Sequence, residues 1–202
     1  MNAQRPYSMS TRSTSTARTK ERILHAVLEL STEKLSVEIV LADVAARSGV
    51  TVQTILRHFG SRDGLFDAAV TFATAEVVAE REAPVGDVPE AVRVIVDHYE
   101  SRGDWVLSLL GQETTDARIR GITVVGKEVH RRWVQTVFEP FLSTQEPRSR
   151  TETVDLLVVA TDVYAWKLIR RDAGRSRQET EHRIIRLIRA ILESPPERTH
   201  HV

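Results

Sequence analysis

The chain has 202 residues, with 28 basic and 28 acidic side chains, so its formal net charge at pH 7 is zero when histidine is neutral. It contains no cysteine, which excludes disulfide bonds, thiolate nucleophiles and cysteine-ligated zinc. The sequence has neither the apolar core of a signal peptide nor a stretch long enough to cross a bilayer. We therefore expect a cytoplasmic protein with no membrane partner.

The first 18 residues are rich in Ser, Thr and Arg, contain no acid and show no apolar periodicity. We predict that residues 1–18 form a disordered basic arm, which either reaches a DNA minor groove or is a tail without function. A first helix is predicted from Thr19, its expected cap, to about Glu33. Its apolar residues recur at helical spacing and are Ile23, Leu24, Val27, Leu28 and Leu30.

The next segment, LADVAARSGVTVQTILRHF from Leu41 to Phe59, has the pattern of a helix-turn-helix. Ala45 allows the two helices to approach closely, and Gly49 suits a left-handed reversal between them. The hydroxyl of Thr51 can cap the second helix. An ordinary helical hairpin has many of the same features, so this segment alone does not decide between DNA binding and simple packing.

The residues that follow strengthen the DNA-binding interpretation. The stretch TVQTILRHFGSRDGLF resembles the recognition helix and turn of TetR-family transcriptional regulators, whose usual pattern is S-x-x-T-L-Y-x-H-F-x-S-K-E-x-L. The resemblance covers about the first third of the chain and implies a three-helix DNA-binding domain over residues 19–65. Residues 1–65 hold nine basic and six acidic side chains, whereas the remainder has an acidic excess, which is compatible with DNA contact by the first part.

The resemblance also implies which residues contact DNA. Val52, Gln53 and Thr54 would face the major groove, where the Gln53 amide can pair with an adenine. The predicted DNA-binding residues are Thr51, Val52, Gln53, Thr54, Arg57, His58 and Arg62. A solvated side chain is the alternative for Arg57, and an imidazole that closes the helix C-terminus is the alternative for His58.

Two positions depart from the family pattern. Leu56 stands where relatives usually have a Tyr that reaches a phosphate, and its side chain has no donor or acceptor. Ile39 and Val40 occupy the region where relatives usually place a Thr that caps the next helix. We expect weaker anchoring to the DNA backbone, since phosphate contacts set affinity and register.

Beyond Gly64 the sequence predicts helices to near its end, so the fold class is all-α. Residues 66–193 are predicted to form a C-terminal helical domain for effector binding and dimerisation, followed by a disordered tail at 194–202. The expected breaks lie at residues 83–86, at 102–104 and near Pro140, and one helix is predicted from Thr153 to Asp172. Ser176 and Glu179 have the spacing of a capping box that opens the last helix.

The last helix has a more apolar face than the end of a monomer needs. Intramolecular packing explains this from the residues alone. In TetR-like proteins the final two helices instead form a four-helix interface between two subunits, and YAWKLIRRDAGRSRQETE resembles that region. The resemblance therefore implies a homodimer that binds a palindromic, double-stranded operator with half-sites about 34 Å apart.

The middle of the chain is where the resemblance places a pocket for a small-molecule effector. Apolar and aromatic side chains predominate among the candidates, which suggests a hydrophobic ligand. The predicted ligand-binding residues are Trp105, Leu109, Gln112, Glu113, His130, Trp133, Val137, Phe138 and Tyr164. Each of them is equally compatible with a place in the core.

Catalysis is the rival class of function, but the sequence has no Gly-rich phosphate loop, no G-x-S-x-G motif and no metal-ligand spacing. We therefore predict a ligand-responsive regulator, most simply a repressor, with no enzyme activity and no cofactor. The alternative is a helical ligand-binding or interaction protein of the same fold that has lost sequence-specific DNA binding.

Overall fold

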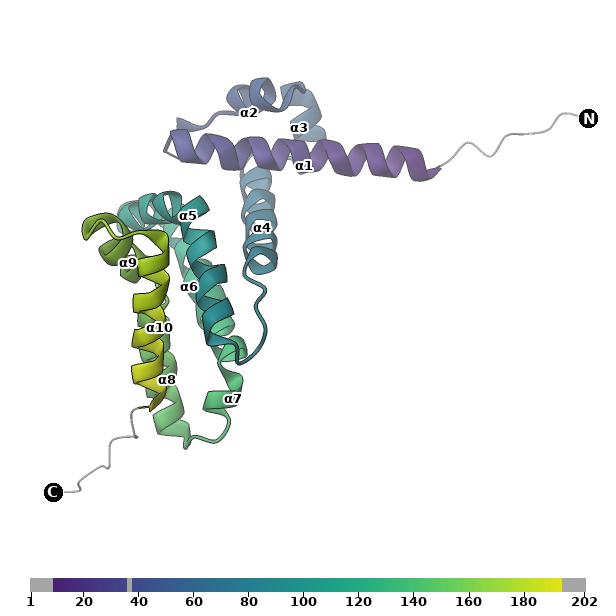
Figure 1. The fold of residues 1–202 in the computed structure, drawn as a ribbon. Coiled ribbons are helices and arrows are strands. Elements are labelled where there is room, and N and C mark those ends of the chain that lie inside the picture. The colour runs from purple at the N-terminus through teal and green to yellow at the C-terminus, as the bar shows by residue number, and fades with distance from the viewer. Residues whose placement is uncertain (1–8, 36–37, 194–202) are drawn as a thin grey trace, which may run out of the picture. The chain divides into compact units, whose positions relative to one another are not determined.

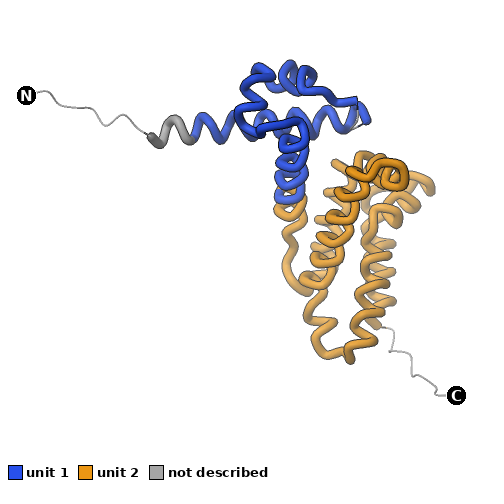
Figure 2. The backbone as a smooth tube through the Cα atoms, turned by 180° about the vertical axis from the view of Figure 1, so that it is seen from behind, with its two compact units in different colours: residues 1–75 blue, residues 76–202 orange. Residues whose placement is uncertain are grey.

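The computed structural model describes residues 9–35 and 38–193, and within these ranges the chain is helical with no strand (Figure 1). The all-α prediction is therefore confirmed for the described residues. The chain divides into two compact units, residues 1–75 and 76–202 (Figure 2). Each unit has its own apolar core.

Unit 1 contains the first three helices and most of the fourth. The helices are α1 (Met9–Glu33), α2 (Leu41–Ser48), α3 (Val52–Phe59) and α4 (Arg62–Glu80). The α1 and α2 helices pack against each other, and an ion pair between Arg47 and the carboxylates of Glu29 and Glu33 joins their exposed edges. The core of the unit draws side chains from all four helices.

The α1 helix starts ten residues earlier than the sequence pattern predicts. Residues 9–18 are helical, and the Thr19 hydroxyl donates to the carbonyl of Ser15 inside the helix, so the prediction that Thr19 caps it is wrong. No glycine or proline lies between Met9 and Thr19 to stop the helix. The rest of the expected arm, residues 1–8, and the expected tail, residues 194–202, lie outside the described residues.

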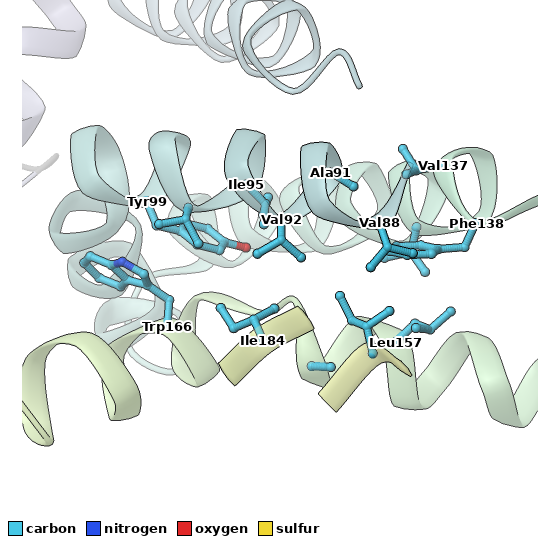
Figure 3. Packing of buried hydrophobic residues seen from close by; sticks show 14 of the residues in the cluster. Val88, Ala91, Val92, Ile95, Tyr99, Val137, Phe138, Leu157, Trp166 and Ile184 are labelled. Carbon is cyan, nitrogen blue, oxygen red and sulfur yellow. The ribbon is translucent and has the colours of Figure 1, made fainter. Parts of the chain in front are cut away.

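Unit 2 is a helical bundle around α5. Its elements are α5 (Val88–Gln112), α6 (Ala117–Val137), α7 (Glu139–Leu142), α8 (Pro147–Ala160), α9 (Val163–Trp166), a π-helical segment η2 (Lys167–Asp172) and α10 (Arg177–Glu193). The α5 helix packs against α6, α9 and α10. Its inward side chains meet those of the other helices in one apolar cluster (Figure 3).

Several helix starts follow the expected capping chemistry. The side chains of Asp87 and Asp116 accept backbone N–H bonds at the starts of α5 and α6. Ser176 and Glu179 form the reciprocal bonds of a capping box before α10. Such caps replace partners that the first turn of a helix lacks, and each is worth about 1 kcal/mol.

The predicted break at residues 102–104 is wrong, because α5 runs through it. Gly103 is buried there, and a Cβ atom added to it would lie only 2.6 Å from Cζ3 of Trp166. The glycine is therefore explained by the close approach of the indole, not by a turn. Trp166 is itself fully buried, and its Nε1 donates to Glu100 on α5.

The predicted single helix from Thr153 to Asp172 is also wrong. The α8 helix ends at Ala160, and a new helix begins after Asp162, whose carboxylate accepts a bond from the Tyr164 N–H. The Thr161 hydroxyl donates to the carbonyl of Leu157. Thr and Asp side chains compete for backbone partners in this way, so their succession interrupts a stretch whose apolar spacing looks continuous.

We predict that Gly103→Ala lowers the free energy of unfolding by roughly 1–3 kcal/mol, because the new methyl group overpacks the contact with Trp166. Gly111→Ala is the matched control on the same helix, since no atom lies within 4 Å of its added Cβ. There alanine's higher helix propensity should stabilise the protein by up to about 1 kcal/mol. Urea unfolding of both variants measures the difference, and equal effects would rule out the proposed steric role of Gly103.

Candidate nucleic-acid interface

The angle between α2 and α3 is set by a buried corner. Val44 and Ala45 on α2 and Ile55 on α3 all lie in the core of unit 1. Between the two helices Gly49 adopts φ 65° and ψ 37°, and its N–H donates to the Ala45 carbonyl. This left-handed conformation costs other L-residues about 1 kcal/mol or more, so the predicted role of Gly49 is confirmed.

The start of α3 is fixed by Thr51, as the sequence predicts. Its hydroxyl oxygen accepts the backbone N–H of Thr54 at 3.1 Å and lies 3.0 Å from the Thr54 hydroxyl. This cap holds the first turn of the helix in place. Thr51 is exposed and Thr54 half-buried, so both hydroxyls lie at the edge of the outer face.

One face of α3 is buried and the opposite face is open. Ile55 is fully buried, while Gln53 and Arg57, four residues apart and therefore adjacent on a helix surface, are exposed. Val52 is half-buried and packs against the core, which leaves less of it for an outside partner than the sequence pattern suggests. The Gln53 amide, which can form two hydrogen bonds at once, and the Arg57 guanidinium therefore lie side by side on the solvent-facing side of α3.

His58 lies in positively charged surroundings. Its pKa is lowered from the ordinary value, first by partial burial and then by the nearby charges of Arg57 and Lys20. Lys20 is an exposed residue of α1 that sequence reasoning did not assign to the site. Only the fold of unit 1 brings Lys20 near His58, so local sequence carried no signal for it. Lys20 and Arg57 supply a basic surface suited to phosphate beside His58, whose neutral ring can donate one hydrogen bond.

Arg62 has an intramolecular role that the sequence did not predict. Its Nε donates to the carbonyl of Ile39 at 3.1 Å, and its guanidinium lies 4.5 Å from the centroid of the Phe66 ring. The bond to Ile39 ties the start of α4 to the segment that precedes α2, and the contact with Phe66 lies within α4 itself. Arg62 therefore helps to stabilise the corner between α2 and α3.

The two departures from the family pattern have the expected local consequences. Val40 occupies the N-cap position of α2 and makes no side-chain capping bond. Leu56 is half-buried on α3 and offers no hydrogen bond to a phosphate. The outer face of α3 consequently has Arg57 and His58, but no phenol, for contact with the DNA backbone.

Four of the predicted ligand-binding residues come together in unit 2. The rings of His130 and Trp133 stack with centroids 5.9 Å apart, and the Trp133 ring meets Phe138 edge-on at 6.2 Å. Val137 and Phe138 are buried in the core (Figure 3). The Trp133 Nε1 donates to the carbonyl of Arg81 at 2.7 Å. This aromatic group lies beside a buried arginine that the sequence analysis did not single out.

The other predicted ligand-binding residues have different surroundings. Tyr164 is 51% exposed, and Leu109 is buried. The Gln112 amide donates to the carbonyl of Ser108, and Glu113 forms an ion pair with Lys127 on α6. Trp105 is half-buried. None of the nine lines the open groove of about 680 Å³ that lies among Val85–Pro89, Phe141, Arg189, Leu192 and Glu193.

No group of three or more His, Cys, Asp or Glu side chains in residues 9–35 and 38–193 is placed to hold a metal ion. None of the described helices is both long and apolar enough to cross a bilayer.

Comparison with known proteins agrees with this geometry. Residues 39–69 match the family described as bacterial regulatory proteins, tetR family. A tetR-family transcriptional regulator from Streptomyces coelicolor superimposes with a TM-score of 0.63 at 14% identity, over 87% of this chain and 80% of that chain. A transcriptional regulator from Rhodococcus sp. Rha1 gives 0.61 at 21% identity, over 86% and 96% respectively. No curated protein matches significantly. The resemblance to the TetR family is therefore confirmed, and the fold is that of its regulators.

We predict that Arg57→Ala and Arg62→Ala weaken DNA binding for different reasons. Loss of the exposed Arg57 should weaken binding to all duplex sequences alike and reduce the slope of log affinity against log salt by about 1, with the free energy of unfolding unchanged.

Loss of Arg62 should lower the free energy of unfolding by about 1–2 kcal/mol, because its bond to Ile39 and its contact with Phe66 disappear. Filter binding at several salt concentrations and urea unfolding separate the two, and an Arg62→Ala protein of unchanged stability would contradict the assignment.

We predict that His130 makes unit 2 sensitive to acid. Burial lowers its pKa to about 4, so between about pH 6.5 and 4 the unfolded chain binds a proton that the folded chain does not. Stability is therefore lost as pH falls through this window, by about 1.4 kcal/mol per pH unit for one such group. His130→Gln should flatten urea-derived stability against pH by this amount, whereas His182→Gln, at an exposed position of α10, should not. An unchanged slope in His130→Gln would show that the imidazole is protonated in the folded state.

Proposed function

We propose that this chain, which has the fold and the helix-turn-helix segment of the TetR family, is a sequence-specific transcriptional regulator. The observation that carries the proposal is the outer face of α3, where Gln53 and Arg57 project from a helix held by a buried corner and a Thr51 cap. A side-chain amide and a guanidinium are the groups that read adenine and guanine edges in the major groove.

The basic surface beside this face supports backbone contact. The charges of Arg57 and Lys20 both act on His58 and lower its pKa. Phosphate contacts of this kind supply affinity, orientation and salt dependence, while base-edge contacts supply discrimination between sequences. In this proposal Gln53 discriminates between DNA sequences, and the basic side chains bind the phosphate backbone.

We further propose that the protein acts as a homodimer through α8 and α10. These two helices pack against each other and still carry large exposed apolar side chains. On α8 and the following segment these are Leu156, Val159, which is 67% exposed, and Leu168, and on α10 the residue is Leu187. A two-fold interface would cover such a surface and would match a palindromic operator with half-sites one helical turn apart.

In the proposed mechanism the protein is a repressor, and a small molecule releases it from the operator. The molecule binds unit 2 and prefers the conformer that fits the operator poorly, so that it weakens DNA binding by its differential affinity. A coupling of about 1–3 kcal/mol, which corresponds to roughly 5- to 150-fold, is usual for such switches.

The experiment that tests the function is selection of bound duplexes from a random DNA pool by the purified full-length chain. A palindromic consensus bound at nanomolar concentration would support a dimeric, sequence-specific regulator. No enrichment over random sequence, with and without candidate effectors, would instead favour the alternative. In that case Leu56 and Val40 would mark a protein of the same fold that no longer reads DNA and acts only by ligand or protein binding.

We predict that Gln53→Ala relaxes the preference at one base position of each selected half-site by about 1–3 kcal/mol, because the bidentate amide contact is lost. Affinity for duplexes that differ at other positions should keep its order. Gln135→Ala is the matched control, since Gln135 is exposed on α6 in the other unit. Competition binding with single-base variants of the selected duplex measures the effect, and an unchanged preference at every position would remove Gln53 from the reading surface.

A further inference from the structure

Arg81 is a buried cation in unit 2. It follows directly after α4, and only 6% of its surface is exposed. Its guanidinium carbon lies 5.6 Å from the centroid of the Tyr99 ring, and its carbonyl accepts the Trp133 Nε1–H. Burial lowers the pKa of Arg81, but a guanidinium remains charged at any ordinary pH.

Among residues 9–35 and 38–193, no carboxylate forms an ion pair or hydrogen bond with the Arg81 guanidinium. Its Nε is buried and has no hydrogen-bond partner. The charges of Glu80 and Asp162 act on Arg81 without a hydrogen bond to it. The Glu80 carboxylate is instead bound by Arg102 and by His98 Nδ1, and Asp162 Oδ1 accepts the Tyr164 N–H at the start of α9. A buried charge that lacks a bonded partner costs several kcal/mol, which proteins rarely leave uncompensated.

Two neutral histidines beside Arg81 each have a free acceptor. Burial and the charge of Arg81 hold the pKa of His98 at about 3 and that of His130 at about 4. His98 Nδ1 donates to Glu80, and His130 Nε2 faces the Thr161 hydroxyl, which itself donates to a carbonyl. The other ring nitrogens, His98 Nε2 and His130 Nδ1, are therefore lone-pair acceptors, and both are buried without a partner in the part of the chain that the structure describes.

Aromatic side chains surround these groups. Tyr99 is fully buried, with its hydroxyl bonded to the carbonyl of Thr161, and Trp133 stacks on His130. Figure 3 shows Tyr99 in the row of core side chains along α5. Trp133 and Asp162 are only half-buried, so the cluster lies close to the surface of the unit. The flat or slender apolar part of a ligand would pack well against these aromatic rings.

We propose that unit 2 binds a small organic carboxylate at Arg81, with the anionic group on the guanidinium, the apolar body against Trp133 and Tyr99, and any hydroxyl donor on His98 or His130. Water would leave the positive charge of Arg81 uncompensated, whereas a carboxylate accepts from the Arg81 Nε–H and balances that charge. The two histidine acceptors call for a hydroxyl donor elsewhere on the ligand. The inference rests on the proposed function in one respect, because it names the chemical class of the effector.

The test uses three acids and their neutral amides as probes of the purified full-length protein: benzoate, 4-hydroxybenzoate and octanoate, against benzamide, 4-hydroxybenzamide and octanamide. Thermal unfolding and titration calorimetry at pH 7.5 measure binding without DNA. At least one acid should raise the midpoint of unfolding and bind at least tenfold more tightly than its amide. Absence of any acid-over-amide preference in the three pairs would overturn the proposal.

Variants then locate the site. Arg81→Met keeps the volume and removes the charge, and it should reduce affinity for the acid at least tenfold. Arg81→Lys keeps the charge without the planar fork and should bind with intermediate affinity. The matched control is Arg93→Met on the exposed face of α5, where Arg93 pairs with Glu90 and Asp97, and its affinity should stay within twofold of wild type. Undiminished binding of the acid by Arg81→Met would overturn the proposal, and if that variant fails to fold, the Lys variant and the acid-amide comparison decide.

The regulatory role is read separately, from operator affinity with and without the bound acid. A change of fivefold or more in wild type that is absent in Arg81→Met would support the carboxylate as effector. Binding of the acid with unchanged operator affinity would overturn the effector role alone. Failure of the protein to select any DNA would overturn the proposed function, while the result on Arg81 would still stand on the calorimetry.

Discussion

Burial of Ile55 decides what unit 1 presents to a partner. With Val44 and Ala45 it fills the corner between α2 and α3, and this fixes the rotation of α3 about its own axis. Gln53 and Arg57 are then on the open face because they lie about half a turn away from Ile55. The left-handed Gly49, the Thr51 cap and the bond from Arg62 to the Ile39 carbonyl all support the same corner. In the proposed function, recognition is thus a consequence of packing, since Gln53 and Arg57 are exposed.

In unit 2, by contrast, several polar groups are buried inside an apolar bundle and need hydrogen-bond partners there. The indole of Trp166 fits against Gly103 and still finds a carboxylate on Glu100. Tyr99 is likewise satisfied by the Thr161 carbonyl. Against this background of matched partners, the unpartnered nitrogens of Arg81, His98 and His130 stand out, because most buried polar atoms in proteins are hydrogen-bonded. A site that is incomplete in the free protein is what an effector would complete.

The sequence predicts those features that depend on neighbours along the chain. The turn at Gly49, the cap at Thr51 and the capping box at Ser176 follow from a few adjacent residues, and the structure confirms each of them. The errors arise where a distant partner decides. Gly103 resembles a helix break until Trp166 is placed against it. Lys20 comes near His58 only through the fold of unit 1, and Arg81 lies just before the predicted break at residues 83–86, where no local pattern marks it as buried. The regular apolar spacing from Thr153 to Asp172 hides a break that Thr161 and Asp162 impose through their side chains.

The measurement that tests the central claim most directly is a nuclear magnetic resonance titration of the isotope-labelled full-length protein with its selected duplex. The claim is that the open face of α3 reads DNA while the corner beneath it stays unchanged. We therefore expect the largest side-chain and amide shifts at Gln53 and Arg57, smaller shifts at Lys20 and His58, and little change at the methyl groups of Val44 and Ile55. Shifts concentrated outside unit 1, or large shifts at the corner with none at Gln53, would contradict the account.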